Sequence, residues 1–182
     1  LSVPEGHDKP LKYPLMFSIC DVLLINKIDV LPYFDFDIEA CKERVKKLNP
    51  NIEIIPISAK TGDGLEALVE EIHSGGGMAR ALNLRCRTFY MGGGTPTTLT
   101  AGQLDRVLTA LEDAFDLQDC EELTVEAGRP DTITAEKLAV LRNHGVTRVS
   151  VNPQTFEENV LRAIGRRHSA TDIPVSYTHL RA

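Results

Sequence analysis

The sequence lacks several features that would assign a protein to a class directly. It has no dense lysine or arginine tract, and its formal net charge is -6, so it offers no electrostatic footprint for nucleic acid or an anionic membrane surface. No apolar run approaches the roughly 20 residues that a membrane-spanning helix needs. The first residues also lack the charged and apolar pattern of a leader. These absences favour a cytoplasmic protein whose partners are small molecules or proteins.

The spacing of the cysteines excludes two further classes. The sequence has four, Cys20, Cys41, Cys86 and Cys120, and no two of them form a C-x-x-C pair. Such wide spacing is typical of reduced thiols in the cytoplasm and not of a disulfide framework or a local metal clip. With 42% hydrophobic and 25% charged residues, the composition is that of a globular chain, long enough for one ordinary domain or two small ones.

The first part of the chain alternates apolar strands with amphipathic helices. Val22–Ile25 is an uninterrupted apolar run, and Ile52–Ile57 is a second apolar segment, as expected for strands buried in a parallel sheet. Between them, apolar residues recur at helical spacing from Ile38 to Leu48, behind the capping residue Asp37. A second helix is expected to begin after Asp63. This order of elements predicts an α/β fold.

Polar residues follow both of these strands at their carboxyl ends, where open α/β sheets bind ligands. They are Asn26, Lys27 and Asp29 after the first strand, and Ser58, Ala59 and Lys60 after the second. Asp29 can accept two hydrogen bonds from the N1 and amino groups of guanine, a contact that adenine cannot make. Lys27 can cover the purine face, the Ala59 N–H can meet O6, and Ser58 can steady Asp29. The alternative is that these are two ordinary polar loops.

Residues Leu1 to about Lys60, including Glu5–Pro14 and Leu31–Tyr33, resemble the hydrogenase nickel-incorporation GTPase family, HypB. The resemblance implies GTP or GDP as cofactor, hydrogenase-maturation proteins as partners, and a metal-ligating cysteine near Cys20. The sequence contains no G-x-x-x-x-G-K-[ST] motif, so the loop that cradles the phosphates is missing and hydrolysis is not expected. For Cys20 the favoured interpretation is a core thiol, with a nickel or zinc ligand as the alternative.

The second part of the chain restarts the alternation of strands and helices. Strands are expected at Thr88–Met91, Leu123–Val125 and Val146–Val151, with helices behind Thr100 and Thr134. Repeated strand and helix units with right-handed crossovers imply a slice of a parallel barrel or sheet. The glycine run that begins at Gly92, together with Glu126 and Gln154, falls at the carboxyl ends of three different strands. These residues should therefore converge on one face, although turn glycines and a solvated acid are the plain alternative.

Residues Thr88 to about Ile173 look like the S-adenosylmethionine-binding part of a radical SAM enzyme similar to oxygen-independent coproporphyrinogen III oxidase, in particular its HemZ-like branch. The closest segments are Glu126–Asp131 and Asn152–Phe156. The resemblance implies that six residues bind S-adenosylmethionine: Gly93, Gly94, Thr95, Glu126, Gln154 and Arg166. That family holds a [4Fe-4S] cluster on a C-x-x-x-C-x-x-C loop, and the four cysteines here do not have that spacing. Radical chemistry is therefore not expected.

Taken together, these patterns predict an α/β chain in which a parallel β-sheet fragment of a P-loop-type GTPase domain is joined to a partial (βα) radical SAM barrel. The expected divisions are a GTPase part at 1–74, a junction at 75–84, a barrel part at 85–173 and a non-native-looking tail at 174–182. Gly75–Gly77 is interpreted as a flexible connector, with an interrupted long helix as the alternative. The expected function is binding of guanine nucleotide and of S-adenosylmethionine without catalysis. A coproporphyrinogen-oxidase-like protein and a noncatalytic interaction module are the alternatives. A chimeric reading frame is the hypothesis for the fusion.

Overall fold

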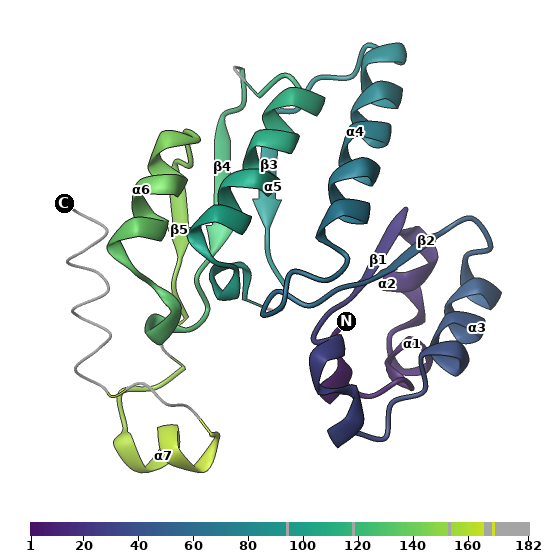
Figure 1. The fold of residues 1–182 in the computed structure, drawn as a ribbon, viewed down its shortest axis with the longest axis vertical. Helices are drawn as coiled ribbons and strands as arrows, with labels where there is room; N and C mark the ends of the chain where they lie inside the picture. The colour runs from purple at the N-terminus through teal and green to yellow at the C-terminus, as the bar shows by residue number, and fades with distance from the viewer. Residues whose placement is uncertain (94, 118, 153, 166–168, 170–182) are drawn as a thin grey trace. The chain divides into compact units, whose positions relative to one another are not determined.

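The computed structural model of the chain describes residues 1–93, 95–117, 119–152, 154–165 and 169 (Figure 1). The chain divides into two compact units, Leu1–Glu70 and Glu71–Ala182. Among the described residues, the helices are all too short or too polar to cross a membrane. The boundaries at 1–74, 75–84 and 85–173 remain a prediction.

The first unit is a small parallel sheet with helices packed against it. Its elements in chain order are η1 (Val3–Glu5), α1 (Lys9–Lys12), α2 (Pro14–Ile19), β1 (Val22–Ile25), η2 (Ile28–Tyr33), α3 (Ile38–Leu48) and β2 (Glu53–Pro56). β1 pairs with β2 in parallel, with Val22 opposite Glu53 and Ile25 opposite Pro56. Phe17, Ile25 and other apolar side chains form the core of this unit. The two polar loops therefore leave the sheet at the same edge, as expected from the sequence.

Helix α3 confirms the expected element between the two strands. The Asp37 Oδ1 atom accepts a 2.9 Å hydrogen bond from the Ala40 N–H, which satisfies one of the free amides at the start of the helix. Cys41 and Val45 lie on its buried face, at the spacing that the sequence pattern indicates. The short helices α1, α2 and η2 do not appear among the predicted elements because their segments are too short for a periodic pattern to develop.

The second unit contains a three-stranded parallel sheet in the order β3-β4-β5. Its elements are β3 (Thr88–Met91), η3 (Pro96–Thr98), α5 (Ala101–Ala114), β4 (Glu122–Glu126), η4 (Pro130–Thr132), α6 (Ala135–Asn143), β5 (Arg148–Ser150) and α7 (Glu158–Ala163). Helices α5 and α6 pack against each other (Figure 1). The α/β class with parallel sheets is confirmed.

The ends of α5 and α6 follow the capping signals in the sequence. The Gln103 N–H donates to Thr100 Oγ1 at 3.2 Å, and the Thr100 N–H donates to Gln103 Oε1 at 2.9 Å, which is a complete capping box. The Lys137 N–H donates to Thr134 Oγ1 at 3.3 Å. Gly145 closes α6 with a φ of 68°, a left-handed conformation that glycine adopts without strain.

Helix α4 (Leu65–Ala81) is continuous through Gly75–Gly77, so the interpretation of these glycines as a flexible connector is wrong for this structure. The reason is close packing. A Cβ atom at Gly76 would lie 2.3 Å from the Ala114 carbonyl oxygen and 2.6 Å from the Ala114 Cβ. Only glycine allows α4 to approach the end of α5 this closely. Arg80 strengthens the contact by donating from Nη1 to the same carbonyl at 2.5 Å.

Candidate functional site

The loops that follow β1 and β2 are joined through side chains and backbone. Ser58 is 2% exposed, and its hydroxyl donates a 2.7 Å hydrogen bond to Asp29 Oδ1. The Ile28 N–H donates to the Ile57 carbonyl at 3.2 Å. The Asp29 carboxylate is therefore held in place by the loop of the neighbouring strand, which is the arrangement that the sequence pattern predicts.

Asn26 links the same two loops from the other side. Its Oδ1 atom accepts a 2.7 Å hydrogen bond from the Lys27 N–H and a 3.4 Å hydrogen bond from the Ala59 N–H. Lys27 has a φ of 66°, a left-handed conformation that costs a residue with a side chain about 1–2 kcal/mol. Such strain persists where surrounding contacts hold it, and it is concentrated at binding sites. Lys27 is half-buried, whereas Lys60 is exposed.

The turn after Ser58 is closed by its own hydrogen bonds. The Gly62 N–H donates to the Ser58 carbonyl at 2.8 Å, and the Ser58 N–H donates to the Asp63 carbonyl at 2.9 Å. Gly64 has a φ of 76°, and a Cβ there would lie 2.2 Å from the Pro56 carbonyl oxygen. The turn thus packs closely against the end of β2, and this packing fixes the positions of Ser58 and Ala59.

At the carboxyl edge of the second sheet, Gly92 packs against side chains of two strands. A Cβ at Gly92 would lie 2.5 Å from Tyr90 Cε1 and 3.1 Å from Glu126 Cδ. The Tyr90 hydroxyl donates to Glu126 Oε1, and this hydrogen bond is the main reason that the pKa of Tyr90 is raised. The backbone after β3 therefore passes directly over Glu126, because residue 92 has no side chain.

The loops beyond these strands contain several left-handed residues. Gly93, Thr95 and Gln154 have φ values of 95°, 65° and 66°. Thr95 Oγ1 lies 3.6 Å from the position of a Cβ on Gly128, so the loops after β3 and β4 touch. Gln154 follows β5, and its N–H donates to Asn152 Oδ1 at 3.0 Å. Gly93, Thr95, Glu126 and Gln154 thus lie at one edge of the sheet, whereas Gly94 and Arg166 lie outside the described residues.

A half-buried lysine on α6 contacts two of these loops. Lys137, on α6, donates from Nζ to the Thr97 carbonyl at 2.6 Å and to the Thr132 carbonyl at 3.1 Å. The Thr97 and Thr132 hydroxyls are 2.6 Å apart. Burial lowers the pKa of Lys137. The sequence gives no local signal for this cluster, because its members come from three separate elements.

Comparisons with known proteins divide the chain in two. The sequence pattern of the radical SAM superfamily matches residues 62–173, which is more than half of the chain. The chain belongs to the radical SAM superfamily. The pattern of the CobW/HypB/UreG nucleotide-binding domain matches residues 2–56. The expected pairing of a HypB-like fragment with a radical SAM fragment is therefore confirmed.

Individual relatives show the same division. The oxygen-independent coproporphyrinogen-III oxidase-like protein HemZ of Bacillus subtilis is 40% identical over 121 residues, covering 66% of this chain and 24% of that protein. The hydrogenase maturation factor HypB of Azotobacter vinelandii is 55% identical over 65 residues, covering 36% of this chain and 22% of that protein. The solved HypB of Archaeoglobus fulgidus is 35% identical, with a TM-score of 0.38, and covers 39% of this chain and 38% of that chain. The chain therefore spans only about a quarter of the length of these curated relatives.

The four cysteines of this chain do not have the C-x-x-x-C-x-x-C spacing that holds a [4Fe-4S] cluster. Within the described residues, no three His, Cys, Asp or Glu side chains are grouped as metal ligands. The four cysteines are free thiols in the structure. Cys20 is half-buried and packs against the core of the first unit, and its carbonyl accepts a 2.8 Å hydrogen bond from Asn49 Nδ2. Its interpretation as a metal ligand remains a prediction.

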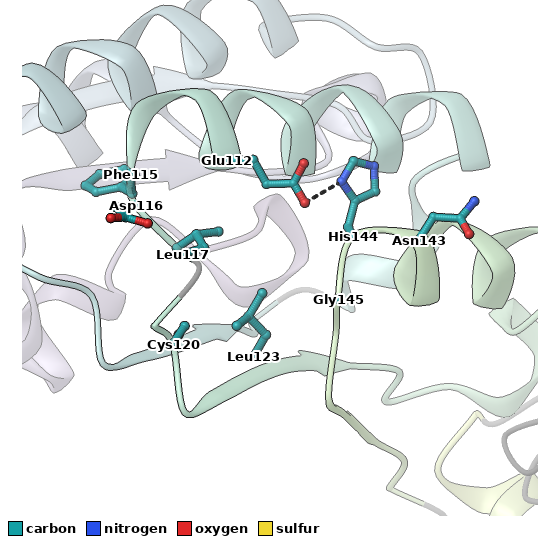
Figure 2. Close-up of a pocket in the computed structure, with 9 residues that line it drawn as sticks. All are labelled: Glu112, Phe115, Asp116, Leu117, Cys120, Leu123, Asn143, His144 and Gly145. Atoms are coloured by element: carbon teal, nitrogen blue, oxygen red, sulfur yellow. Dashed lines mark ion pairs between the residues drawn. The ribbon is translucent and has the colours of Figure 1, made fainter.

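A pocket of about 510 Å³ lies in the second unit near the amino ends of β4 and β5, opposite the carboxyl edge of that sheet. Figure 2 shows the Glu112 carboxylate directed at the His144 ring. His144 Nδ1 lies 2.9 Å from Glu112 Oε1, and its Nε2 lies 2.9 Å from Asp105 Oδ1. Burial alone would lower the pKa of His144, but the two carboxylates outweigh it and raise the pKa. Sequence reasoning misses this cluster because it joins α5 to the end of α6.

Proposed function

We propose that the loops after β1 and β2 bind the base of a guanine nucleotide. The observation that carries this proposal is the hydrogen bond from the Ser58 hydroxyl to Asp29 Oδ1 at 2.7 Å. It fixes the carboxylate while leaving acceptor capacity for two N–H groups, since an ionised carboxylate has about four acceptor sites. Guanine presents two adjacent N–H donors, and adenine does not.

The remaining groups complete a pocket for a purine. The Ala59 N–H donates a long hydrogen bond of 3.4 Å to Asn26 Oδ1, and it can exchange this partner for guanine O6. The half-buried stem of Lys27 supplies an apolar surface for the ring. The sequence contains no G-x-x-x-x-G-K-[ST] motif to bind the phosphates, so the base and ribose must provide the affinity. We expect a dissociation constant in about the millimolar range.

Calorimetric titration of the chain with GDP and ADP tests this proposal. Asp29→Ala should weaken GDP binding about a hundredfold, because two charge-assisted hydrogen bonds of about 1.5 kcal/mol each are lost. Asp21→Ala is the matched control, because Asp21 is an exposed aspartate at the opposite end of β1. Equal affinity of the unaltered chain for GDP and ADP, or equal losses in the two variants, would show that the site does not read guanine.

We also propose that the carboxyl edge of β3, β4 and β5 binds the nucleoside part of S-adenosylmethionine. The observation in favour is the close passage of the Gly92 backbone over Glu126, where a Cβ would lie 3.1 Å from Glu126 Cδ. A bare backbone beside a half-buried carboxylate suits a ligand with amino and hydroxyl donors. Gly94 and Arg166 are included in this proposal through the family resemblance alone.

Equilibrium dialysis with S-adenosylmethionine tests the second site. Gly92→Ala should reduce binding at least tenfold, because the added methyl group displaces Tyr90 and Glu126. Gly102→Ala, on α5, is the control, since a Cβ there meets nothing within 4 Å. If Gly92→Ala binds S-adenosylmethionine as tightly as the unaltered chain does, the proposed site at this edge of the sheet is wrong.

We further propose a cytoplasmic location and an association with hydrogenase-maturation proteins. The first follows from the cysteine spacing, and the second from the similarity to proteins named hydrogenase maturation factors. Co-purification of the tagged chain with a nickel-hydrogenase precursor complex tests the association. A shortened chain that ends at Glu70 keeps only the first unit. If this shortened chain no longer co-purifies with the complex, the contact belongs to the second unit, which would contradict a HypB-like role.

A further inference from the structure

Cys86 and Cys120 lie opposite each other, just before β3 and β4 begin. Within the sheet, Thr88 stands in register with Glu122. The pairing continues one residue back, where the Glu121 N–H donates to the Arg87 carbonyl at 2.8 Å. Parallel strands keep a constant offset, so one further step back brings the two cysteines together, 34 residues apart in the sequence.

Ion pairs on both sides hold this register. Arg87 and Glu121 form a salt bridge of 2.8 Å, and Arg85 and Asp119 form one of 3.8 Å. These exposed pairs contribute little to stability individually, but they flank the cysteines and align the two segments. Cys86 and Cys120 therefore occupy paired positions of two aligned segments and do not belong to two independent loops.

The two thiols point toward the same space. Cys86 Sγ donates to the Thr88 carbonyl at 3.4 Å, and Cys120 Sγ donates to the Glu122 carbonyl at 3.5 Å. Each thiol thus uses the carbonyl two residues further along its own strand, which places both on the same face. Burial, followed by the neighbouring Cys120 thiol, raises the pKa of Cys86.

The pair is open to small reagents. Both cysteines are half-buried, in contrast to the fully buried Cys41. Cys120 lines the pocket of about 510 Å³ near the amino ends of β4 and β5. A small oxidant can therefore approach Cys120 from the pocket, and the Cys86 thiol then lies beside the modified sulfur.

We propose that Cys86 and Cys120 form a redox-active dithiol that closes to a disulfide in the presence of a small-molecule disulfide such as oxidised glutathione. The Cys120 thiolate attacks one sulfur of the reagent, forms a mixed disulfide and releases one thiolate. The Cys86 thiolate then attacks the Cys120 sulfur, forms the bond between the two cysteines and releases the second thiolate. The reagent gains two electrons, and the two cysteine protons go to the released thiolates.

The test is to oxidise the native chain with oxidised glutathione and to map its disulfides by mass spectrometry. The number of free thiols should fall from the four of the reduced chain to two, with a linked Cys86–Cys120 peptide pair and a mass loss of about 2 Da. Closure should accelerate as the pH rises above neutrality, because only the thiolate attacks. It should slow at least tenfold in concentrated guanidinium chloride, where the register is lost.

Variants separate this pair from the other thiols. Cys86→Ser and Cys120→Ser should each leave a glutathione adduct on the remaining cysteine and no internal disulfide. Cys20→Ser removes another half-buried thiol. This variant should form the Cys86–Cys120 disulfide as the unaltered chain does. Stable glutathione adducts on both Cys86 and Cys120 in the native, unaltered chain, or a bond that uses Cys20 or Cys41, would overturn the proposal.

Discussion

Alanine substitutions at the neighbouring residues Gly76 and Gly77 distinguish a packed helix from a flexible connector. Both positions lie inside α4, so alanine gains roughly 0.5–1 kcal/mol of helix propensity at either one. Their surroundings differ. A Cβ at Gly77 meets nothing within 4 Å, whereas a Cβ at Gly76 would lie 2.3 Å from the Ala114 carbonyl oxygen and 2.6 Å from the Ala114 Cβ.

The opposite signs of the two effects follow from this difference. Gly77→Ala should stabilise the second unit by about 0.5–1 kcal/mol. In Gly76→Ala the atoms that must move belong to the backbone and Cβ of α5 and not to a flexible side chain, so α4 has to shift away. Overpacking of this kind costs about 1–3 kcal/mol. It also lengthens the hydrogen bond from Arg80 to the Ala114 carbonyl, so the net effect should be destabilising by about 1–2 kcal/mol.

Hydrogen exchange followed by mass spectrometry is the suitable assay, because it reads the two units separately. Amides of α4 and of the end of α5 should exchange about tenfold faster in Gly76→Ala and several-fold slower in Gly77→Ala, since 1.4 kcal/mol corresponds to a factor of ten. A flexible connector would give fast exchange at all three glycines and nearly equal, small effects of the two substitutions. That result would refute the packed helix.

Three further predictions concern other contacts. Ser58→Ala should weaken GDP binding about tenfold by freeing Asp29, and should lower the free energy of unfolding in urea by about 1 kcal/mol, because the buried hydroxyl also accepts a hydrogen bond from the Thr61 N–H; an unaltered affinity would contradict the positioning role. Gly64→Ala should destabilise the first unit by roughly 2–4 kcal/mol, because it combines a left-handed φ of 76° with a Cβ 2.2 Å from the Pro56 oxygen. The raised pKa of His144 should stabilise the fold below pH 6.5 and lose that contribution as the pH rises through the folded-state value. Urea unfolding at a series of pH values from below 6.5 upward should show this decline in the free energy of unfolding, and His144→Gln should abolish the pH dependence.

The sequence predicts the parallel strands and the capped helices well because these signals are local. Asp37, Thr100 and Thr134 all cap the helices that follow them. The boundaries of the strands are less accurate: the expected Val146–Val151 strand is only Arg148–Ser150, because strand ends depend on which residues find partners on β4. The candidate residues at the strand ends follow from topology, since all parallel strands end at one edge.

Contacts that depend on register are beyond such reasoning. Cys86 and Cys120 look unrelated in the sequence, and only the offset between β3 and β4 shows that they face each other. The expectation of a flexible connector at the glycines of α4 fails for a similar reason. Their composition is typical of a linker, but the deciding fact is the proximity of Ala114, which lies on another helix.

Both candidate sites hold a carboxylate in the same way. In the first unit a serine hydroxyl from the neighbouring strand's loop donates to Asp29, and in the second a tyrosine hydroxyl from the neighbouring strand donates to Glu126. A hydroxyl donor restrains an ionised carboxylate without neutralising it, whereas a lysine or arginine in its place would cancel the charge and compete with the ligand. The carboxylate then meets ligand N–H or O–H donors in a fixed orientation. This arrangement needs only two adjacent parallel strands, so it is present in both units although their sheets have two and three strands.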